Sequence, residues 1–224
     1  MQQVFSQHRL WIILFGSFWL IGLAIWFITD HGQELVWLTG WRTERLAQLL
    51  SYWTKIVEFP AYVLALLWFL YTDRQYTIIL IMVSVMVPLL SFGLKALFAH
   101  ERPWDFYTRT EQLDQLLWID GADVLRGLNG FPSGHSLSAF ALFGLLALIY
   151  YKRTWFVLVC FFMASGVAIS RMYLGHHFLK DVLFGSLMGF LLSAVVIGFI
   201  HPRIQRAWSS RGHSPRGRST TKNP

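Results

Sequence analysis

The chain of 224 residues is 55% hydrophobic and only 14% charged, and it contains 11 Trp and 19 Phe residues. Because a soluble domain averages about 25% charged residues, this deficit indicates a chain that lies in lipid rather than in water. The formal net charge of +7 does not indicate nucleic-acid binding, since much of it lies in the last 24 residues, next to a membrane exit.

Apolar runs long enough to cross about 30 Å of hydrocarbon, roughly 17–25 residues each, recur along the chain. We expect a single all-α transmembrane domain over residues 1–200, with the first run retained as a span because no clean cleavage site follows it. A basic tail over 201–224 has a composition typical of disorder, and its charge either binds anionic lipid or sets the orientation. The six predicted helices lie near 10–29, 53–71, 76–98, 137–151 (with a start near Ser133), 154–173 and 179–200.

The second span has an amphipathic segment before it. Leu46, Leu49, Leu50 and Trp53 recur at helical spacing, which is typical of an interfacial helix or of an outward extension of the span. We expect a combination of the two, with a bend near Pro60.

The basic residues predict the orientation of the chain. The very short loops around Arg74 and around Lys152 and Arg153 are where the positive-inside rule is most reliable. Of the 12 acidic residues, only Asp73 falls on that side. We therefore expect both termini inside and the loops 30–52, 99–132 and 174–178 outside. The single cysteine, Cys160, lies in an apolar run and is expected to be a buried free thiol.

Ionisable groups at membrane depth are costly and tend to be functional, and the sequence concentrates them in three clusters. In the first cluster, KALFAHERP, Lys95 and Arg102 are seven residues apart. On one helix this is about two turns, so both cations would project from one side before Pro103 ends the helix. Taken alone, a Lys reaching for the interface and an interfacial Arg explain the pattern more simply.

The second cluster is the stretch NGFPSGHS at the start of the fourth span. Ser133 suits an N-cap, and Gly134 allows a ligand to approach the backbone closely. The free amide groups of the first helical turn would form an anion site, with His135 beside it. A capped helix with an incidental histidine is the alternative.

The third cluster is SRMYLGHHFLKD, with Arg171 at the outer end of the fifth span. His177 and Asp181 are four residues apart, so they share a helical face if the sixth span starts near Phe178. A carboxylate that accepts a hydrogen bond from Nδ1 would fix the tautomer and leave Nε2 as a nucleophile or base. His176 fits this spacing less well and is interpreted as a loop or interfacial histidine.

The predicted topology places all three clusters at the outer membrane face. Three cations, a helix N-terminus and two histidines suit a phosphate ester, in which one His attacks and the other protonates the leaving group. A zinc site is an alternative, but the three cations would repel a metal ion. An anion transporter would show inverted repeats or broken helices in matching halves, and neither is evident.

Together these clusters resemble, without a substitution, the three signature motifs of the type 2 phosphatidic acid phosphatase (PAP2) superfamily. The same core occurs in soluble vanadium haloperoxidases. The apolar spans, however, are similar to the integral membrane branch, which includes bacterial phosphatidylglycerophosphate phosphatase B and undecaprenyl pyrophosphate phosphatases. The matching positions, within residues 95–181, are Lys95-x6-Arg102-Pro103, Pro132-Ser133-Gly134-His135 and Ser170-Arg171-x5-His177-x3-Asp181.

The resemblance implies a role for each matched residue. His177 would attack phosphorus in line and form a phosphohistidine that water hydrolyses, while Asp181 would orient His177 and stabilise its charged form. His135 would act first as the general acid and then as the base. No metal or other cofactor is implied. The phosphoryl oxygens would be bound by Lys95, Arg102, Ser133, Gly134 and Arg171.

We therefore expect an integral membrane lipid phosphatase of a bacterial inner membrane, with its site facing the periplasm. Its expected partners are the bilayer and a lipid substrate: undecaprenyl pyrophosphate, phosphatidylglycerol phosphate or phosphatidic acid. A phosphotransferase that passes phosphate from a lipid pyrophosphate to another lipid is the alternative within the family.

Overall fold

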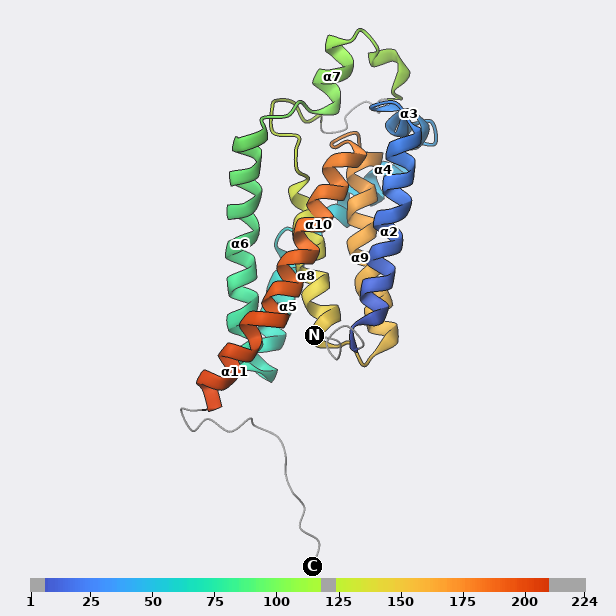
Figure 1. Ribbon diagram of the computed structural model, residues 1–224. Coiled ribbons are helices and arrows are strands. Elements are labelled where there is room, and N and C mark those ends of the chain that lie inside the picture. Colours follow the sequence, from blue (N-terminus) through green and yellow to red (C-terminus); the bar gives the residue numbers. More distant parts are fainter. Residues whose placement is uncertain (1–6, 118–123, 210–224) are drawn as a thin grey trace, which may run out of the picture.

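The computed structural model describes residues 7–117 and 124–209, and within these ranges it is helical and contains no strand. This confirms the predicted all-α class (Figure 1). The helices are α2 (Arg9–Ile28), α3 (Gln33–Thr39), α4 (Glu44–Lys55), α5 (Pro60–Thr72), α6 (Arg74–Phe98), α7 (Pro103–Arg109), η1 (Leu113–Gln115), α8 (Gly134–Ile149), α9 (Thr154–Tyr173), α10 (Leu179–Val195), η2 (Val196–Ile200) and α11 (His201–Ser209).

Five helical segments of the described chain are long and apolar enough to cross a membrane. They are Arg9–Ile28, Glu44–Thr72, Arg74–Arg109, Thr154–Tyr173 and Leu179–Arg206. The sixth predicted span, α8, is apolar but only 16 residues long, which at 1.5 Å per residue is about 24 Å. The predicted count of six spans is therefore approximate. Helix α8 also begins deeper in the bundle than the level at which α6 ends (Figure 1).

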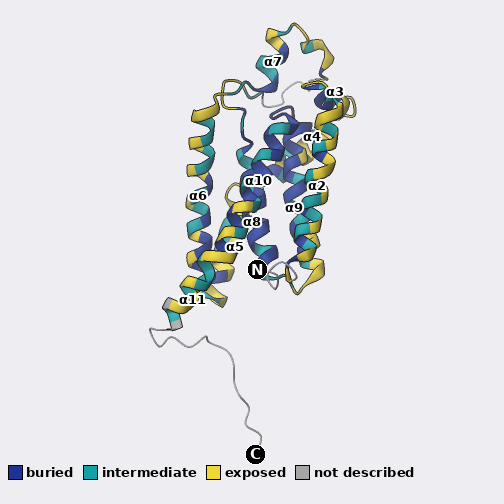
Figure 2. Cartoon of the chain, in the orientation of Figure 1, coloured by how far each residue is buried: buried dark blue, intermediate teal, exposed yellow. Residues whose placement is uncertain are grey.

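Helix α8 is the central helix of the bundle, and most of its side chains are buried (Figure 2). Helix α10 crosses it closely at two glycines. A Cβ at Gly185 would clash with the carbonyl oxygen of Ser133, and one at Gly189 would clash with the carbonyl oxygen of Leu137. Small residues four apart allow such close backbone approach between membrane helices.

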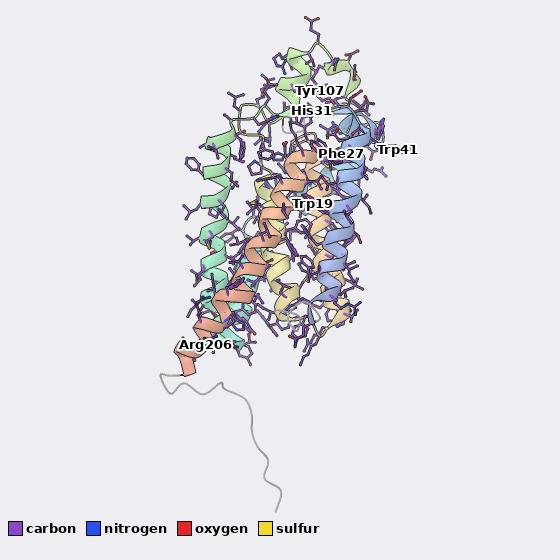
Figure 3. The ribbon with its side chains drawn as sticks, viewed as in Figure 1. Trp19, Phe27, His31, Trp41, Tyr107 and Arg206 are labelled. Carbon is purple, nitrogen blue, oxygen red and sulfur yellow. The ribbon has the colours of Figure 1, made fainter. Side chains whose placement is uncertain are left out.

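The outer helices expose large apolar side chains. Such an extensive apolar surface marks contact with a partner or with lipid, and the hydrocarbon of a bilayer suits it. On the inner side of α2, Trp19 Nε1 donates a hydrogen bond of 3.0 Å to the carbonyl oxygen of Leu183 on α10 (Figure 3). Among the exposed residues are Leu20, Ile21, Phe27, Leu67, Leu70, Phe92 and Phe162.

The predicted bend before the second span is present. Helix α4 ends at Lys55, and α5 begins with Pro60 in its first turn, where the missing proline N–H removes no helical hydrogen bond. The turn over residues 56–59 lies between them and carries Glu58.

The expectation that Lys95 and Arg102 share one helix is wrong. Helix α6 ends at Phe98, and Ala99 turns the chain with a φ of 41°. Arg102 is extended, with φ −82° and ψ 160°, and Pro103 begins α7 instead of ending the preceding helix. The two cations are therefore brought together by tertiary contacts and not by helical spacing.

The helices start and end at two opposite ends of the bundle. Helices α6 and α9 end, and α8 and α10 begin, at the end covered by α7, whereas α2 starts and α11 ends at the opposite one (Figure 1). Tyr107 belongs to α7 and His31 lies near it, whereas Arg206 lies at the far end (Figure 3). The Tyr107 hydroxyl donates to the carbonyl oxygen of Gly32 at 2.8 Å, which joins α7 to the α2–α3 turn.

The C-terminal part departs from the expected boundary at residue 200. Helix α10 continues through the π-helical η2 into α11, which reaches Ser209. The remainder of the predicted tail, residues 210–224, lies outside the described residues.

We expect Gly189→Ala to destabilise the protein, because the added methyl group would push α10 away from α8. Overpacking of this kind lowers the free energy of unfolding by about 1–3 kcal/mol, which lowers Tm by roughly 2–12 °C for a chain of this size. Thermal unfolding in detergent measures it. Gly16→Ala is the matched control, since nothing lies within 4 Å of a Cβ at Gly16. Equal Tm values for the two variants would contradict the proposed packing.

Candidate active site

The second and third polar clusters meet where α8 and α10 begin. The Ser133 N–H donates to the carbonyl oxygen of Asp181 at 3.0 Å. The loop before α8 also contacts the loop before α10, because His177 Nδ1 lies 2.7 Å from the carbonyl oxygen of Gly130. These contacts join the motif residues of two clusters that are more than 40 positions apart in the sequence.

His177 is buried and has a defined tautomer. Its Nδ1 donates to Gly130, whereas Asp181 Oδ2 lies 3.6 Å away, too far for a hydrogen bond. The backbone carbonyl, and not the carboxylate that we expected, therefore orients the ring and leaves the lone pair on Nε2. Burial, followed by the positive charges of Arg171 and Arg102, holds the pKa of His177 well below its ordinary value. The imidazole is thus neutral, as a nucleophile must be.

Asp181 caps the N-terminus of α10. Its Oδ2 accepts a 2.9 Å hydrogen bond from the Phe178 N–H, and Glu34 Oε1 accepts one of 3.2 Å from the Leu179 N–H. Both carboxylates thus satisfy free amides at the start of α10. At 3.6 Å from His177, the Asp181 carboxylate is also close enough to stabilise positive charge on that ring.

Arg102 is held by the loop before α8. Its Nε donates to Asn129 Oδ1 at 2.6 Å, its Nη1 to the carbonyl oxygen of His176 at 3.0 Å, and its Nη2 to the carbonyl oxygen of Asn129 at 3.4 Å. The buried guanidinium therefore has a fixed plane. The sequence carried no signal for Asn129 beyond its place in the stretch that leads to Ser133.

Arg171 is also buried, and its Nη1 donates to Thr54 Oγ1 at 3.2 Å. Thr54 belongs to α4, in the first 94 residues, where no motif was evident. Its role depends on a contact over 117 positions of sequence, which no local pattern could reveal.

The N-terminus of α8 has the predicted cap. Ser133 Oγ accepts from the Ser136 N–H at 3.4 Å and from the Ser136 hydroxyl at 2.9 Å. A Cβ at Gly134 would meet Ser91 Oγ at 2.8 Å and would lie 3.9 Å from Lys95 Nζ. Glycine therefore lets α6 approach the start of α8 and brings the Lys95 ammonium close to the first-turn amides, a combination that favours an anion.

His135 faces a carboxylate that the sequence analysis did not identify. Its Nε2 lies 2.8 Å from Oε1 of Glu58, in the turn before α5. This pair borders a cleft of about 560 Å³ between α5, α6 and α8. The polar end of the cleft contains Lys95 and Gly134, and the remainder is mainly apolar, formed by Val57, Phe59, Tyr62, Val63, Leu66, Leu80, Ile81, Val87 and Pro88.

The structure therefore gathers the eight predicted site residues at one end of the bundle. The charges of Arg171, Arg102, Lys95 and His135 all act on His177. Such an arrangement can hold a tetrahedral oxyanion between cations and helix amides, with a nucleophile on one side and a proton donor bordering an apolar cleft.

Comparison with known proteins is consistent with this chemistry. The family model of the PAP2 superfamily matches residues 75–205, more than half of the chain. Phosphatidylglycerophosphatase B of Bacillus subtilis (strain 168) is 30% identical over 138 residues, which are 52% of this chain and 68% of the relative. YbjG of Escherichia coli (strain K12), named as a candidate undecaprenyl-diphosphatase, is 30% identical over 149 residues, 66% of this chain and 64% of the relative.

The fold is also similar to that of a solved structure. The crystal structure of the transmembrane PAP2 type phosphatidylglycerolphosphate phosphatase from Bacillus subtilis superposes with a TM-score of 0.61 at 22% identity. The match covers 90% of this chain and 98% of that one.

We expect Asn129→Ala to weaken the binding of orthophosphate, because Arg102 would lose the acceptor for its Nε. A hydrogen bond to a charged group contributes about 1.5–3 kcal/mol, so the affinity should fall about tenfold or more. The rise in Tm with added phosphate reports this affinity, since a ligand that binds the folded state stabilises it. Gln48→Ala, at an exposed position whose side chain donates to Glu44, is the control. The same phosphate dependence in both variants would exclude this role for Asn129.

Proposed function

This chain belongs to the PAP2 superfamily as a membrane lipid phosphatase, and we propose that it hydrolyses a lipid phosphomonoester or pyrophosphate through a phosphohistidine. The observation that carries the proposal is the neutral, buried His177 beside three cations. Its Nδ1 donates to Gly130, so its Nε2 has the lone pair needed for attack.

In the first step, Nε2 of His177 attacks phosphorus in line with the leaving oxygen. The P–N bond forms as the P–O bond breaks, and His135 gives its proton to the departing lipid oxygen. The phosphoryl oxygens are bound by Lys95, Arg102 and Arg171, with the cap hydroxyl of Ser133 and the Gly134 amide at the start of α8.

In the second step, water attacks the phosphohistidine. His135, now neutral, accepts a proton from this water, the P–N bond breaks, and orthophosphate leaves. The Asp181 carboxylate, 3.6 Å from the ring of His177, stabilises the positive charge that the phosphorylated imidazole carries.

The cleft supports a lipid substrate. Its polar end contains Lys95 and His135, and its apolar part continues between α5 and α6 along the exposed side chains of Phe59 and Ile81. A lipid phosphate would place its headgroup at the polar end and its hydrocarbon chain along the apolar part. Undecaprenyl pyrophosphate, phosphatidylglycerol phosphate and phosphatidic acid all meet this requirement, and two of these lipid phosphates correspond to the names of the relatives.

The site is proposed to face the periplasm of a bacterial inner membrane, with both termini in the cytoplasm. The support is the basic side chains of the short loops at the opposite end, at Arg74 and at Lys152 and Arg153. The described chain also begins and ends at that opposite end (Figure 1).

The reaction is proposed to need no metal, because Lys95, Arg102 and Arg171 supply the positive charge. We expect the purified protein to release phosphate from a lipid phosphate in the presence of EDTA, and His177→Ala to reduce the rate by at least about 10³-fold, since no nucleophile remains. Released orthophosphate measures both. His201→Ala, at the opposite end of the bundle, should keep the wild-type rate. Full turnover by His177→Ala would overturn the mechanism, and inhibition by EDTA would overturn metal independence.

The orientation is tested by cysteine labelling in intact cells. Cys160 is buried, and its replacement by Ala leaves a background in which one new thiol can be placed. Gln112→Cys, beyond α7, should react with an impermeant maleimide from outside. Thr72→Cys, at the other end of α5, should react only after the cells are permeabilised. Both positions are exposed, and the reverse labelling pattern would place the site in the cytoplasm.

A further inference from the structure

Glu58 belongs to none of the three sequence motifs, yet it contacts one of their histidines directly. Its Oε1 lies 2.8 Å from Nε2 of His135. The two side chains come from different elements, 77 positions apart in the sequence. The His135 side chain is 27% exposed and that of Glu58 is 52% exposed, so the pair lies at the entrance of the cleft and not in the core.

The turn that carries Glu58 is fixed to α8 next to His135. Ser138 Oγ lies 3.3 Å from the carbonyl oxygen of Val57 and 3.2 Å from the Tyr62 hydroxyl. The Tyr62 hydroxyl also donates to the carbonyl oxygen of Ser138 at 3.3 Å. Because Ser138 follows His135 by about one helical turn, these bonds place the carboxylate over the same face of α8 as the imidazole.

We infer that Glu58 is a positioning residue that accepts the Nε2–H of His135 and makes Nδ1 the nitrogen that delivers the proton to the leaving group. The inference rests on the proposed function, in which His135 is the general acid. A carboxylate bound to one nitrogen of an imidazole fixes its tautomer and its ring plane, and stabilises the imidazolium while the other nitrogen exchanges a proton.

The positive charges near His135 explain why a carboxylate beside this histidine would help it act as an acid. A general acid must arrive protonated, but burial and the positive charges of Arg171 and Lys95 disfavour the imidazolium of His135. The hydrogen bond to Glu58 and its negative charge favour the protonated form and so oppose these effects in part. This pair differs from that of His177, whose ring is oriented by the carbonyl oxygen of Gly130 while Asp181 lies 3.6 Å away.

The proton balance of both steps follows. As the P–O bond breaks, the proton on Nδ1 of His135 moves to the leaving oxygen, while the Nε2–H stays hydrogen-bonded to an ionised Glu58. In the second step Nδ1 takes a proton from the attacking water, and His135 returns to its starting form. Glu58 neither gains nor loses a proton.

The pair is not needed for folding. Partly exposed ion pairs contribute little to stability, and the turn is attached to α8 through Ser138 and Tyr62 without Glu58. Glu58→Gln should therefore fold, with a Tm within a few degrees of wild type. The matched control is Glu44→Gln, which removes an exposed carboxylate in the first turn of α4 that accepts a hydrogen bond from Gln48.

The first test compares two soluble substrates that differ in the leaving group, phenyl phosphate and p-nitrophenyl phosphate. The value of kcat/KM covers the steps up to leaving-group departure, and p-nitrophenolate departs with little need of a proton. Glu58→Gln should reduce kcat/KM for phenyl phosphate by about 100-fold, at the lower end of what general acid catalysis contributes, and for p-nitrophenyl phosphate by less than about fivefold. Glu58→Asp, which keeps the charge, should recover part of the loss. An equal loss on both substrates would mean that Glu58 acts on the structure only, and would overturn the inference.

The second test is a double-mutant cycle with His135→Ala. Residues that act as one unit are not additive, so Glu58→Gln should cause no further loss once His135 is absent. Additive losses would overturn the inference and leave the proposed function standing. Conversely, full activity of His177→Ala would remove the proposed function itself, so the two failures are distinguishable.

Discussion

The site depends on how closely α10 crosses α8. Gly185 and Gly189 let the two backbones touch, and the hydrogen bond from Ser133 to the carbonyl oxygen of Asp181 joins their first turns. Because both helices begin at this crossing, the anion-binding amides of α8 and the loop carrying His177 lie next to each other. A wider crossing would separate the proposed phosphate site at the start of α8 from His177, the proposed nucleophile, even if every motif residue were retained.

Around this crossing, neutral groups of the loop before α8 orient the charged ones. The carbonyl oxygen of Gly130 orients His177, and Asn129 provides both an amide and a carbonyl oxygen to Arg102. A carboxylate in these places would neutralise the cations that we propose to bind phosphate, whereas a carbonyl oxygen fixes the direction of these side chains and preserves their charge. The site is thereby pre-organised for an anion before one arrives.

The sequence predicted the parts of this arrangement that depend on local physics. Apolar runs predicted the membrane helices, and Ser133 predicted the cap of α8. Both features depend on residues that are close together in the sequence. The interactions of Thr54 and Glu58 were missed, since each joins segments far apart in the chain. The prediction that Lys95 and Arg102 share one helix was wrong because it assumed that the helix continues past Ala99. The chain turns at that residue, so helical spacing does not apply beyond it.

The position of the cleft has a kinetic consequence. Its apolar part opens between α5 and α6, among side chains as exposed as Phe59, so under the proposed function we expect a lipid to reach the histidines by moving sideways within its leaflet. The encounter would then be two-dimensional. The rate would depend on the mole fraction of the phosphorylated lipid in the membrane surface, and inert lipid added to the same membrane would slow turnover by dilution alone.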